Sequence, residues 1–198
     1  MTKIKLCGMT RPEDIEAVNQ YKADYIGFVF WEKSKRNVSK EQAGKLKALL
    51  DPEILAAGVF VDADPAYVAE LLEEGIIDLA QLHGNESESY IKELRSLSGK
   101  PVIKAFTIRS EEDIKKAEES SADYVLLDSG KGSGMRFNWN YIKDMKRPYF
   151  LAGGLKIENV AEAIESLAPF AVDVSSGIES EGKKDPRKMK DFVDEVRK

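Results

Sequence analysis

Short apolar stretches rich in β-branched and aromatic residues recur along the chain, and segments with helical spacing separate them. The apolar stretches are Ile4–Cys7, Tyr25–Phe30, Leu55–Val61, Leu79–His83, Val102–Phe106, Tyr124–Asp128, Tyr149–Leu151 and Phe170–Val174. They recur at intervals of roughly two dozen residues, the length of a strand plus a crossover helix. Most are nearly continuous rather than alternating, which is typical of strands covered on both faces. The pattern predicts about eight parallel strands.

The segments between these stretches carry helix signals. The expected N-termini are the capping boxes Thr10-x-x-Glu13 and Ser39-x-x-Gln42, and the N-cap-proline pairs Asp64-Pro65 and Asp185-Pro186. Apolar residues with one-face spacing predict helices over 160–167 and 189–196. The weakest segment lies between Asp128 and Tyr149, where we expect a glycine-rich loop and a short helix around Asn138–Met145.

Eight strands alternating with helices in 198 residues predict an α/β fold, a compact (β/α)₈ TIM barrel with helices shorter than usual for that fold. An open doubly wound sheet is the structural alternative. No linker, low-complexity tract or change of charge interrupts the chain, so we expect a single domain over residues 1–198. In either fold the site is expected at the carboxyl ends of the strands.

Composition narrows the function further. A net charge of −5 argues against a nucleic-acid partner but allows a small phosphorylated ligand in a local positive pocket. The single cysteine cannot form an internal disulfide, and the first residues are too charged for a signal peptide. No apolar stretch approaches membrane-spanning length, so we expect a cytoplasmic protein without a membrane partner. No cluster of His, Cys and Asp has the spacing of a metal site.

Polar residues that end two of the predicted strands suggest acid–base chemistry. Cys7 ends the first stretch and Asp128 ends the sixth, so a thiol and a carboxyl group are expected at one rim of the barrel. The alternatives are that Cys7 is a small buried hydrophobic residue and that Asp128 caps a helix.

A phosphate site is the second functional prediction. Gly153 and Gly154 follow the seventh stretch, and Ser176 and Gly177 follow the eighth. In many barrels the loops after these two strands bind phosphate through backbone N–H groups. A glycine pair that only ends a strand is the alternative for Gly153 and Gly154.

The chain resembles the phosphoribosylanthranilate isomerases of tryptophan biosynthesis over essentially its whole length. The motifs that carry the resemblance are Lys5-Leu6-Cys7-Gly8-Met9-Thr10, Gly27-Phe28-Val29-Phe30, Ser34-Lys35-Arg36, Gln81-Leu82-His83-Gly84, Leu126-Leu127-Asp128, Gly132-Ser133-Gly134, Phe137-x-Trp139, Ala152-Gly153-Gly154-Leu155-x-x-Glu158-Asn159-Val160 and Val172-Asp173-Val174-Ser175-Ser176-Gly177-Ile178-Glu179. Their order along the chain is that of the family. The resemblance implies a (β/α)₈ barrel that performs an Amadori rearrangement of a phosphorylated amino sugar without a cofactor.

The resemblance also implies roles for individual residues. Cys7 is expected as the general base, which requires positive surroundings, and Asp128 as the general acid, which requires a raised pKa. Arg36 is the candidate for the anthranilate carboxylate, because its planar fork binds a carboxylate through two hydrogen bonds. Asp173 is expected to hold sugar hydroxyl groups or orient the site, and His83 to line its mouth. A solvated Arg36, a structural Asp173 and a structural His83 are the alternatives.

Other functions remain open at this stage. Aldose–ketose isomerases of histidine biosynthesis catalyse a similar reaction with two aspartates, which the Cys7 motif disfavours. The extended amino-terminal segment of indole-3-glycerol phosphate synthase has no equivalent here. A non-catalytic phosphate-binding barrel is the alternative from another class. Related enzymes include monomers and dimers, so we expect a monomer or a homodimer.

Two features near the sixth strand complete these expectations. The loop Ser129–Arg136 is shorter than is common in the family, which puts closure of a lid in doubt. Phe137 and Trp139 are expected to pack under a loop rather than stack on substrate.

Overall fold

The computed structural model describes residues 1–128, 139–142 and 145–198. Eight strands form the inner ring: β1 Lys3–Cys7, β2 Tyr25–Val29, β3 Leu55–Phe60, β4 Leu79–Leu82, β5 Val102–Thr107, β6 Tyr124–Asp128, β7 Tyr149–Ala152 and β8 Ala171–Val174. The α-helices are α1 Pro12–Tyr21, α2 Lys40–Lys47, α3 Pro65–Glu73, α4 Glu88–Leu97, α5 Glu111–Glu119, α6 Ile157–Leu167 and α7 Pro186–Val196. Two short 3₁₀ helices, η1 Trp139–Tyr141 and η2 Ser176–Ile178, and the strand pair β9 Glu179–Ser180 and β10 Lys183–Lys184 complete the fold.

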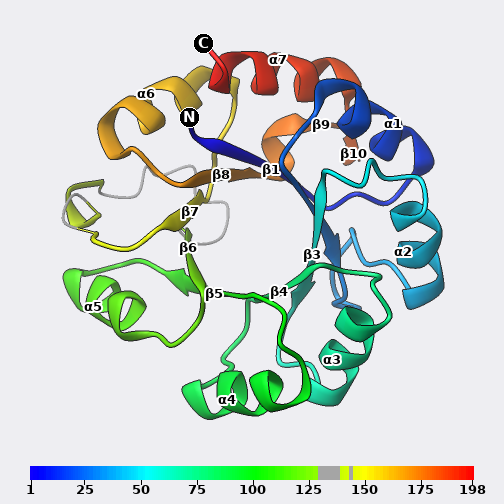
Figure 1. Ribbon diagram of the computed structural model, residues 1–198. Coiled ribbons are helices and arrows are strands. Elements are labelled where there is room, and N and C mark those ends of the chain that lie inside the picture. Colours follow the sequence, from blue (N-terminus) through cyan, green and yellow to red (C-terminus); the bar gives the residue numbers. More distant parts are fainter. Residues whose placement is uncertain (129–138, 143–144) are drawn as a thin grey trace.

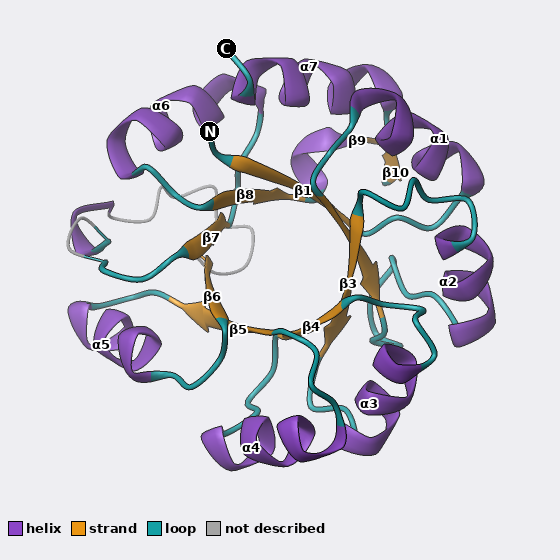
Figure 2. Ribbon diagram, in the orientation of Figure 1, coloured by secondary structure: helices purple, strands orange, loops and turns teal. Residues whose placement is uncertain are grey.

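The eight strands pair in sequence order, and β8 closes the ring by pairing in parallel with β1. Helices surround this ring on the outside (Figures 1 and 2). The (β/α)₈ barrel is therefore confirmed, and the open doubly wound sheet is wrong. All eight carboxyl ends meet at one rim because every ring pairing is parallel.

The barrel interior is apolar at its amino end. An inner cluster draws residues from every strand between β2 and β8: Tyr25, Ala57, Leu79, Ile103, Leu126, Phe150, Ala152 and Ala171. Aromatic rings fill the base, where Phe150 meets Tyr25 at 5.4 Å, Tyr124 at 5.8 Å and Phe170 at 5.6 Å between ring centroids. Aromatic side chains therefore close the amino end of the barrel, and we expect the active site at the opposite rim, where the strands end.

Strand β1 differs from its neighbours on this inner face. Ile4 and Leu6 belong to the outer cluster between strands and helices. Because side chains alternate across a strand, Lys5 and Cys7 point into the barrel. A cation and a thiol therefore face the interior from β1, which contributes no residue to the apolar inner cluster.

The predicted strands are confirmed with small shifts at their ends. Phe30 and His83 fall just outside β2 and β4, although their N–H groups still donate to the carbonyl oxygens of Val59 and Phe60, both in β3. The predicted N-caps Ser39, Asp64 and Asp185 are confirmed, since each side chain accepts a hydrogen bond from the first turn of its helix. The reciprocal half of the box predicted at Ser39 is not formed, because the Gln42 side chain donates to the Thr10 carbonyl instead.

The capping prediction for the first helix is wrong. The N-cap of α1 is Arg11 rather than Thr10, and Asp14 takes the place predicted for Glu13. The Oδ2 atom of Asp14 accepts from the N–H groups of Thr10 at 2.9 Å and Arg11 at 3.0 Å. Because a residue before a proline favours an extended backbone, Arg11 is the N-cap and Pro12 the first helical residue. Arg11 also donates to the Lys184 carbonyl at 2.8 Å.

Most of the segment between β6 and β7, including much of the predicted loop and short helix, lies outside the described residues. Its described part holds η1, and Trp139 is half-buried against the outer core. Packing of Trp139 is therefore confirmed, whereas Gly132-Ser133-Gly134, Phe137 and the loop 129–136 lie outside the described residues. Within the described residues, no helix is long and apolar enough to cross a lipid bilayer.

Candidate active site

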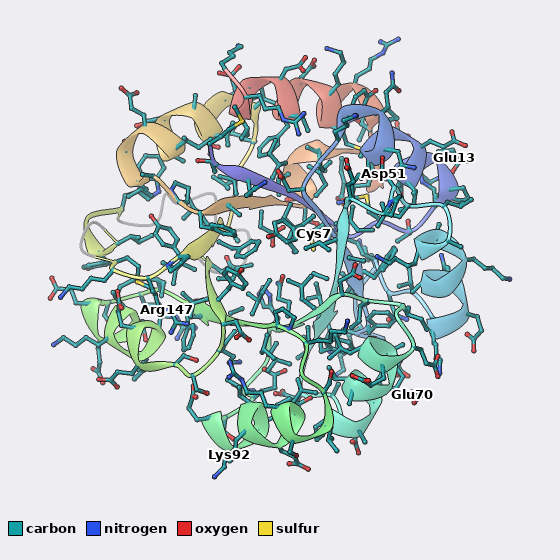
Figure 3. All side chains as sticks on the ribbon, viewed as in Figure 1. Cys7, Glu13, Asp51, Glu70, Lys92 and Arg147 are labelled. Atoms are coloured by element: carbon teal, nitrogen blue, oxygen red, sulfur yellow. The ribbon has the colours of Figure 1, made fainter. Side chains whose placement is uncertain are left out.

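Four of the residues singled out in the sequence line the same rim. Cys7 ends β1, Asp128 ends β6, His83 follows β4, and Asp173 lies near the end of β8. The chain neighbours of each of these residues belong to the outer cluster. Because side chains alternate across a strand, the four residues themselves face the barrel interior. Only β7 and β8 separate β6 from β1 around the ring. Figure 3 shows Cys7 at the inner ring, whereas Glu13, Glu70 and Lys92 lie on the surrounding helices.

The thiol of Cys7 is almost enclosed, with 9% of the residue exposed. It faces Gly27 of β2, its partner in the sheet register, where a Cβ atom would lie only 2.5 Å from Sγ. Burial raises the pKa of the Cys7 thiol above its ordinary value. The ammonium groups of Lys5 and Lys184 act in the opposite direction, and the Asp173 carboxylate reinforces the effect of burial.

Lys5 and Asp173 form an ion pair inside the barrel. The two residues lie opposite each other in the register of β1 and β8, and Lys5 Nζ is 2.8 Å from Asp173 Oδ2. Lys5 also interacts electrostatically with Cys7, which lies two residues along the same face of β1. Burial opposes the charge on Lys5, but attraction to Asp173 and Cys7 outweighs it, so the pKa of Lys5 lies above its ordinary value. The other carboxylate oxygen, Oδ1, is buried and has no hydrogen-bond partner among the described residues.

Arg36 reaches the end of β1 from the loop after β2. A Cβ atom at Gly8 would lie 2.4 Å from Arg36 Cδ, so this glycine leaves room for the arginine stem. The guanidinium donates to both oxygens of Glu179, each at 2.7 Å, and Lys184 Nζ lies 2.6 Å from Glu179 Oε1. Burial would raise the pKa of Glu179, but hydrogen bonds from Arg36 and Lys184 lower it to about 2. Three cations, Lys5, Arg36 and Lys184, therefore lie close enough to interact with Cys7.

The predicted acid has its own partner. His83 Nε2 lies 3.3 Å from Asp128 Oδ2, and His83 Nδ1 lies 3.0 Å from the amide nitrogen of Gln81. An amide nitrogen only donates, so Nδ1 accepts and the neutral imidazole carries its hydrogen on Nε2, facing Asp128. The Gln81 side-chain oxygen is buried and has no hydrogen-bond partner within the described part of the chain.

The two predicted phosphate-binding segments are neighbours. Gly153 and Gly154 follow β7 with φ values of +91° and +67°, which glycine adopts without strain. Ser176 and Gly177 begin η2, whose first N–H groups have no partner inside the helical turn. A Cβ atom at Gly177 would lie 2.2 Å from the Leu155 carbonyl oxygen, so η2 packs directly on the loop after β7.

Three residues of this rim received no role from the sequence. Lys5 carries a detectable signal, because a charged residue interrupts an apolar strand two positions before Cys7. Glu179 and Lys184 lie in the β9–β10 pair, and only tertiary packing brings them beneath Arg36. Among the described residues, no group of three or more His, Cys, Asp or Glu side chains is arranged to hold a metal ion.

Comparisons with known proteins agree with this architecture. The family model described as "N-(5'phosphoribosyl)anthranilate (PRA) isomerase" matches residues 4–195. The chain is 45% identical to the N-(5'-phosphoribosyl)anthranilate isomerase of Clostridium acetobutylicum over 207 residues, covering 100% of this chain and 99% of that one. It also superposes on the phosphoribosyl anthranilate isomerase of Thermotoga maritima with a TM-score of 0.91 and 36% identity, covering 100% and 99% of the two chains.

A further crystal structure has a TM-score of 0.89 and 36% identity, and it covers 100% of this chain and 99% of its own. That protein is a phosphoribosyl anthranilate isomerase in complex with reduced 1-(o-carboxyphenylamino)-1-deoxyribulose 5-phosphate. On the family match, the identities and the shared barrel, the chain belongs to the N-(5'-phosphoribosyl)anthranilate isomerase family, enzymes of tryptophan biosynthesis.

Proposed function

We propose that this chain converts N-(5'-phosphoribosyl)anthranilate into 1-(2-carboxyphenylamino)-1-deoxyribulose 5-phosphate, with Cys7 as general base and Asp128 as general acid. The observation that carries the proposal is the inward orientation of a thiol on β1 and a carboxyl group on β6 at the same barrel rim, so that the two groups face each other across its mouth. Active sites of such barrels form at this rim. The family to which the chain belongs indicates the reaction, and the rim holds two groups that can perform the proton transfers of that reaction.

Two proton transfers account for the rearrangement. Asp128 gives its proton to the ring oxygen as the bond from that oxygen to the first sugar carbon breaks, and the anthranilate nitrogen forms a double bond to that carbon. Cys7 then removes the proton from the second sugar carbon, and the electrons return to nitrogen through a new carbon–carbon double bond. The resulting enol-amine tautomerises to the amino ketone, so the product is an isomer of the substrate. Transfers of this kind contribute about 10²–10⁴-fold each when the groups are well placed.

The charge around the rim suits a substrate that carries a carboxylate and a phosphate. The Nε and Nη2 atoms of Arg36 donate to Glu179. The remaining N–H groups on the outer edge of the guanidinium are left to bind the anthranilate carboxylate. The backbone N–H groups of Gly153, Gly154, Ser176 and Gly177 are the proposed donors to the phosphate.

Asp173 and His83 are the remaining proposed contacts. The unpartnered Oδ1 atom of Asp173 is available to accept a hydrogen bond from a sugar hydroxyl group. His83 donates toward Asp128, which supports a role in holding the acid at the mouth of the site.

Turnover by the purified chain tests this proposal. Phosphoribosylanthranilate is generated in situ, and its disappearance is followed by the loss of its fluorescence. We expect first-order loss at a rate proportional to enzyme concentration. Absence of turnover by a folded chain that still binds the reduced product analogue would contradict the proposal and favour a non-catalytic phosphate-binding barrel.

We also infer that the chain acts in the cytoplasm as a monomer or a homodimer. Its single cysteine supports a reducing compartment. A Thermotoga maritima relative, 35% identical, is described as a dimeric isomerase from which monomers were generated. Sedimentation equilibrium over a hundredfold range of concentration distinguishes the two states.

A further inference from the structure

The ion pair of Lys5 and Asp173 is unusual for its position in the barrel. The Lys5 side chain is 0% exposed and that of Asp173 is 7% exposed. Inward positions of the other strands hold the apolar inner cluster. Desolvating two charges costs several kcal/mol per ion, and apolar residues of similar volume often replace such pairs without loss of stability. Stability alone therefore does not explain why charges occupy this place.

A second contact of Lys5 suggests what the charge does. Lys5 and Cys7 are two residues apart on the same face of β1, so the ammonium group that donates to Asp173 Oδ2 also attracts a negative charge on the sulfur. The ammonium is therefore shared between a carboxylate on β8 and the thiol on β1. Opposite charges attract more strongly in a water-poor interior than at the surface, and a neighbouring ammonium group favours the thiolate over the thiol.

We infer that Lys5 is a positioning residue that stabilises and orients the thiolate of Cys7, and that Asp173 fixes the Lys5 ammonium beside the sulfur. The inference rests on the proposed function, in which Cys7 is the base. The buried pair then has a function, setting the charge and position of Cys7, that is separate from substrate binding and from the stability of the fold. Asp173 then acts on Cys7 through Lys5 in addition to its proposed contact with the substrate.

The other charged groups that act on Cys7 come from separate elements. Lys184 approaches from β10 and Arg36 from the loop after β2, and Glu179 of β9 neutralises part of both charges. Lys184 is also nearly buried, but Glu179 and the Ser175 carbonyl oxygen take its hydrogen bonds. Among these three cations, Lys5 is the one that lies on the same strand and the same face as the sulfur.

Direct titration of the thiol in the intact chain tests the inference. The chain has one cysteine, so the thiolate absorbance near 240 nm reports Cys7 alone once the signal of a Cys7→Ala variant is subtracted. We expect Lys5→Met to raise the titration midpoint by about one unit or more, which lowers the thiolate fraction at neutral pH about tenfold. A midpoint that stays within about 0.3 unit of the wild-type value would overturn the inference.

Two further variants separate this effect from damage to the fold. Lys104→Met removes the ammonium of another buried pair, in which Lys104 Nζ lies 2.7 Å from Glu86 Oε2, and it should leave the Cys7 midpoint unchanged. The double variant Lys5→Met/Asp173→Asn removes both charges and avoids a lone buried carboxylate. We expect it to fold with a raised midpoint, whereas a wild-type midpoint would overturn the inference.

The two proposals fail separately. Wild-type turnover in Cys7→Ser would contradict the assignment of Cys7 as the base, whatever the titration shows. An unmoved midpoint in Lys5→Met would contradict the role of Lys5, even if Cys7 proves essential. A fall in kcat of Lys5→Met that raising the pH relieves supports the inference, because a purely structural defect would not follow the ionisation of the thiol.

Discussion

Arg36 and Glu179 are joined by two parallel hydrogen bonds, in which Nε and Nη2 donate to the two carboxylate oxygens at 2.7 Å each. The residues are 143 positions apart in the chain, so this contact ties the loop after β2 to the strand pair after β8. It orients the guanidinium before any substrate arrives. An orientation set in advance lowers the entropy cost of binding a carboxylate.

Arg36→Ala should chiefly weaken substrate binding. Hydrogen bonds to charged groups contribute about 1.5–3 kcal/mol, so we expect KM to rise about tenfold to a hundredfold with a smaller change in kcat. Arg36→Lys should recover little of the loss, because a lysine lacks the planar fork. Steady-state kinetics of the three proteins check this, and an unchanged KM in Arg36→Ala would show that the carboxylate binds elsewhere.

Glu179→Gln should remove a pH-dependent part of the stability. The folded pKa of Glu179 is lowered to about 2, whereas an unfolded glutamate titrates near about 4.3. A lowered carboxyl pKa stabilises the fold above the unfolded value, and the contribution is lost as the pH falls through the folded value. The wild type should therefore exceed Glu179→Gln by on the order of 3 kcal/mol at pH 6, and this difference should shrink between about pH 4.3 and 2.

Urea unfolding of both proteins at several pH values measures this difference. Glu112→Gln is the matched control, since Glu112 lies 77% exposed on α5 and its exposed pairing with Lys116 should contribute little. A difference between wild type and Glu179→Gln that does not vary with pH would exclude charge pairing as its cause.

Gly27→Ala should impair catalysis through the position of Cys7. The added Cβ atom would lie 2.5 Å from Cys7 Sγ and 3.2 Å from Cys7 Cα, so the thiol or β1 must move. Because a displacement of about 1 Å can cost a hundredfold in rate, we expect kcat to fall by about that factor.

Gly44→Ala is the control for the Gly27 substitution. Gly44 lies inside α2 and nothing stands within 4 Å of its added Cβ atom, so we expect unchanged kcat and a gain of about 0.5–1 kcal/mol in stability. Wild-type kcat in Gly27→Ala would mean that the exact place of the sulfur does not matter.

The fold was predictable because each strand and helix has its own local signal. The sequence places β6 at Tyr124–Asp128, as the structure does, and the N-caps at Ser39, Asp64 and Asp185 are local patterns. The cap at Arg11 was missed although a local signal was present, because proline at the first helical position keeps the residue before it extended.

The electrostatic surroundings of the candidate site were predictable only in part. The sequence predicts that Cys7 needs positive neighbours, but it does not show that Lys5, Arg36 and Lys184 supply them. The pairing of β1 with β8 brings Lys5 beside Asp173, and the β9–β10 hairpin positions the ammonium group of Lys184. The burial that raises the pKa of Cys7 follows from the same packing.

The kinetics of Cys7→Ser and Asp128→Asn, measured beside the affinity of each variant for the reduced product analogue, test the central claim most directly. A serine hydroxyl is a far weaker base than a thiolate, and an asparagine has no acidic proton to give. We predict that each substitution lowers kcat by about 10²–10⁴-fold while the dissociation constant of the analogue changes by only a few-fold. Turnover in either variant close to that of the wild type would contradict the assignment of Cys7 and Asp128 as base and acid.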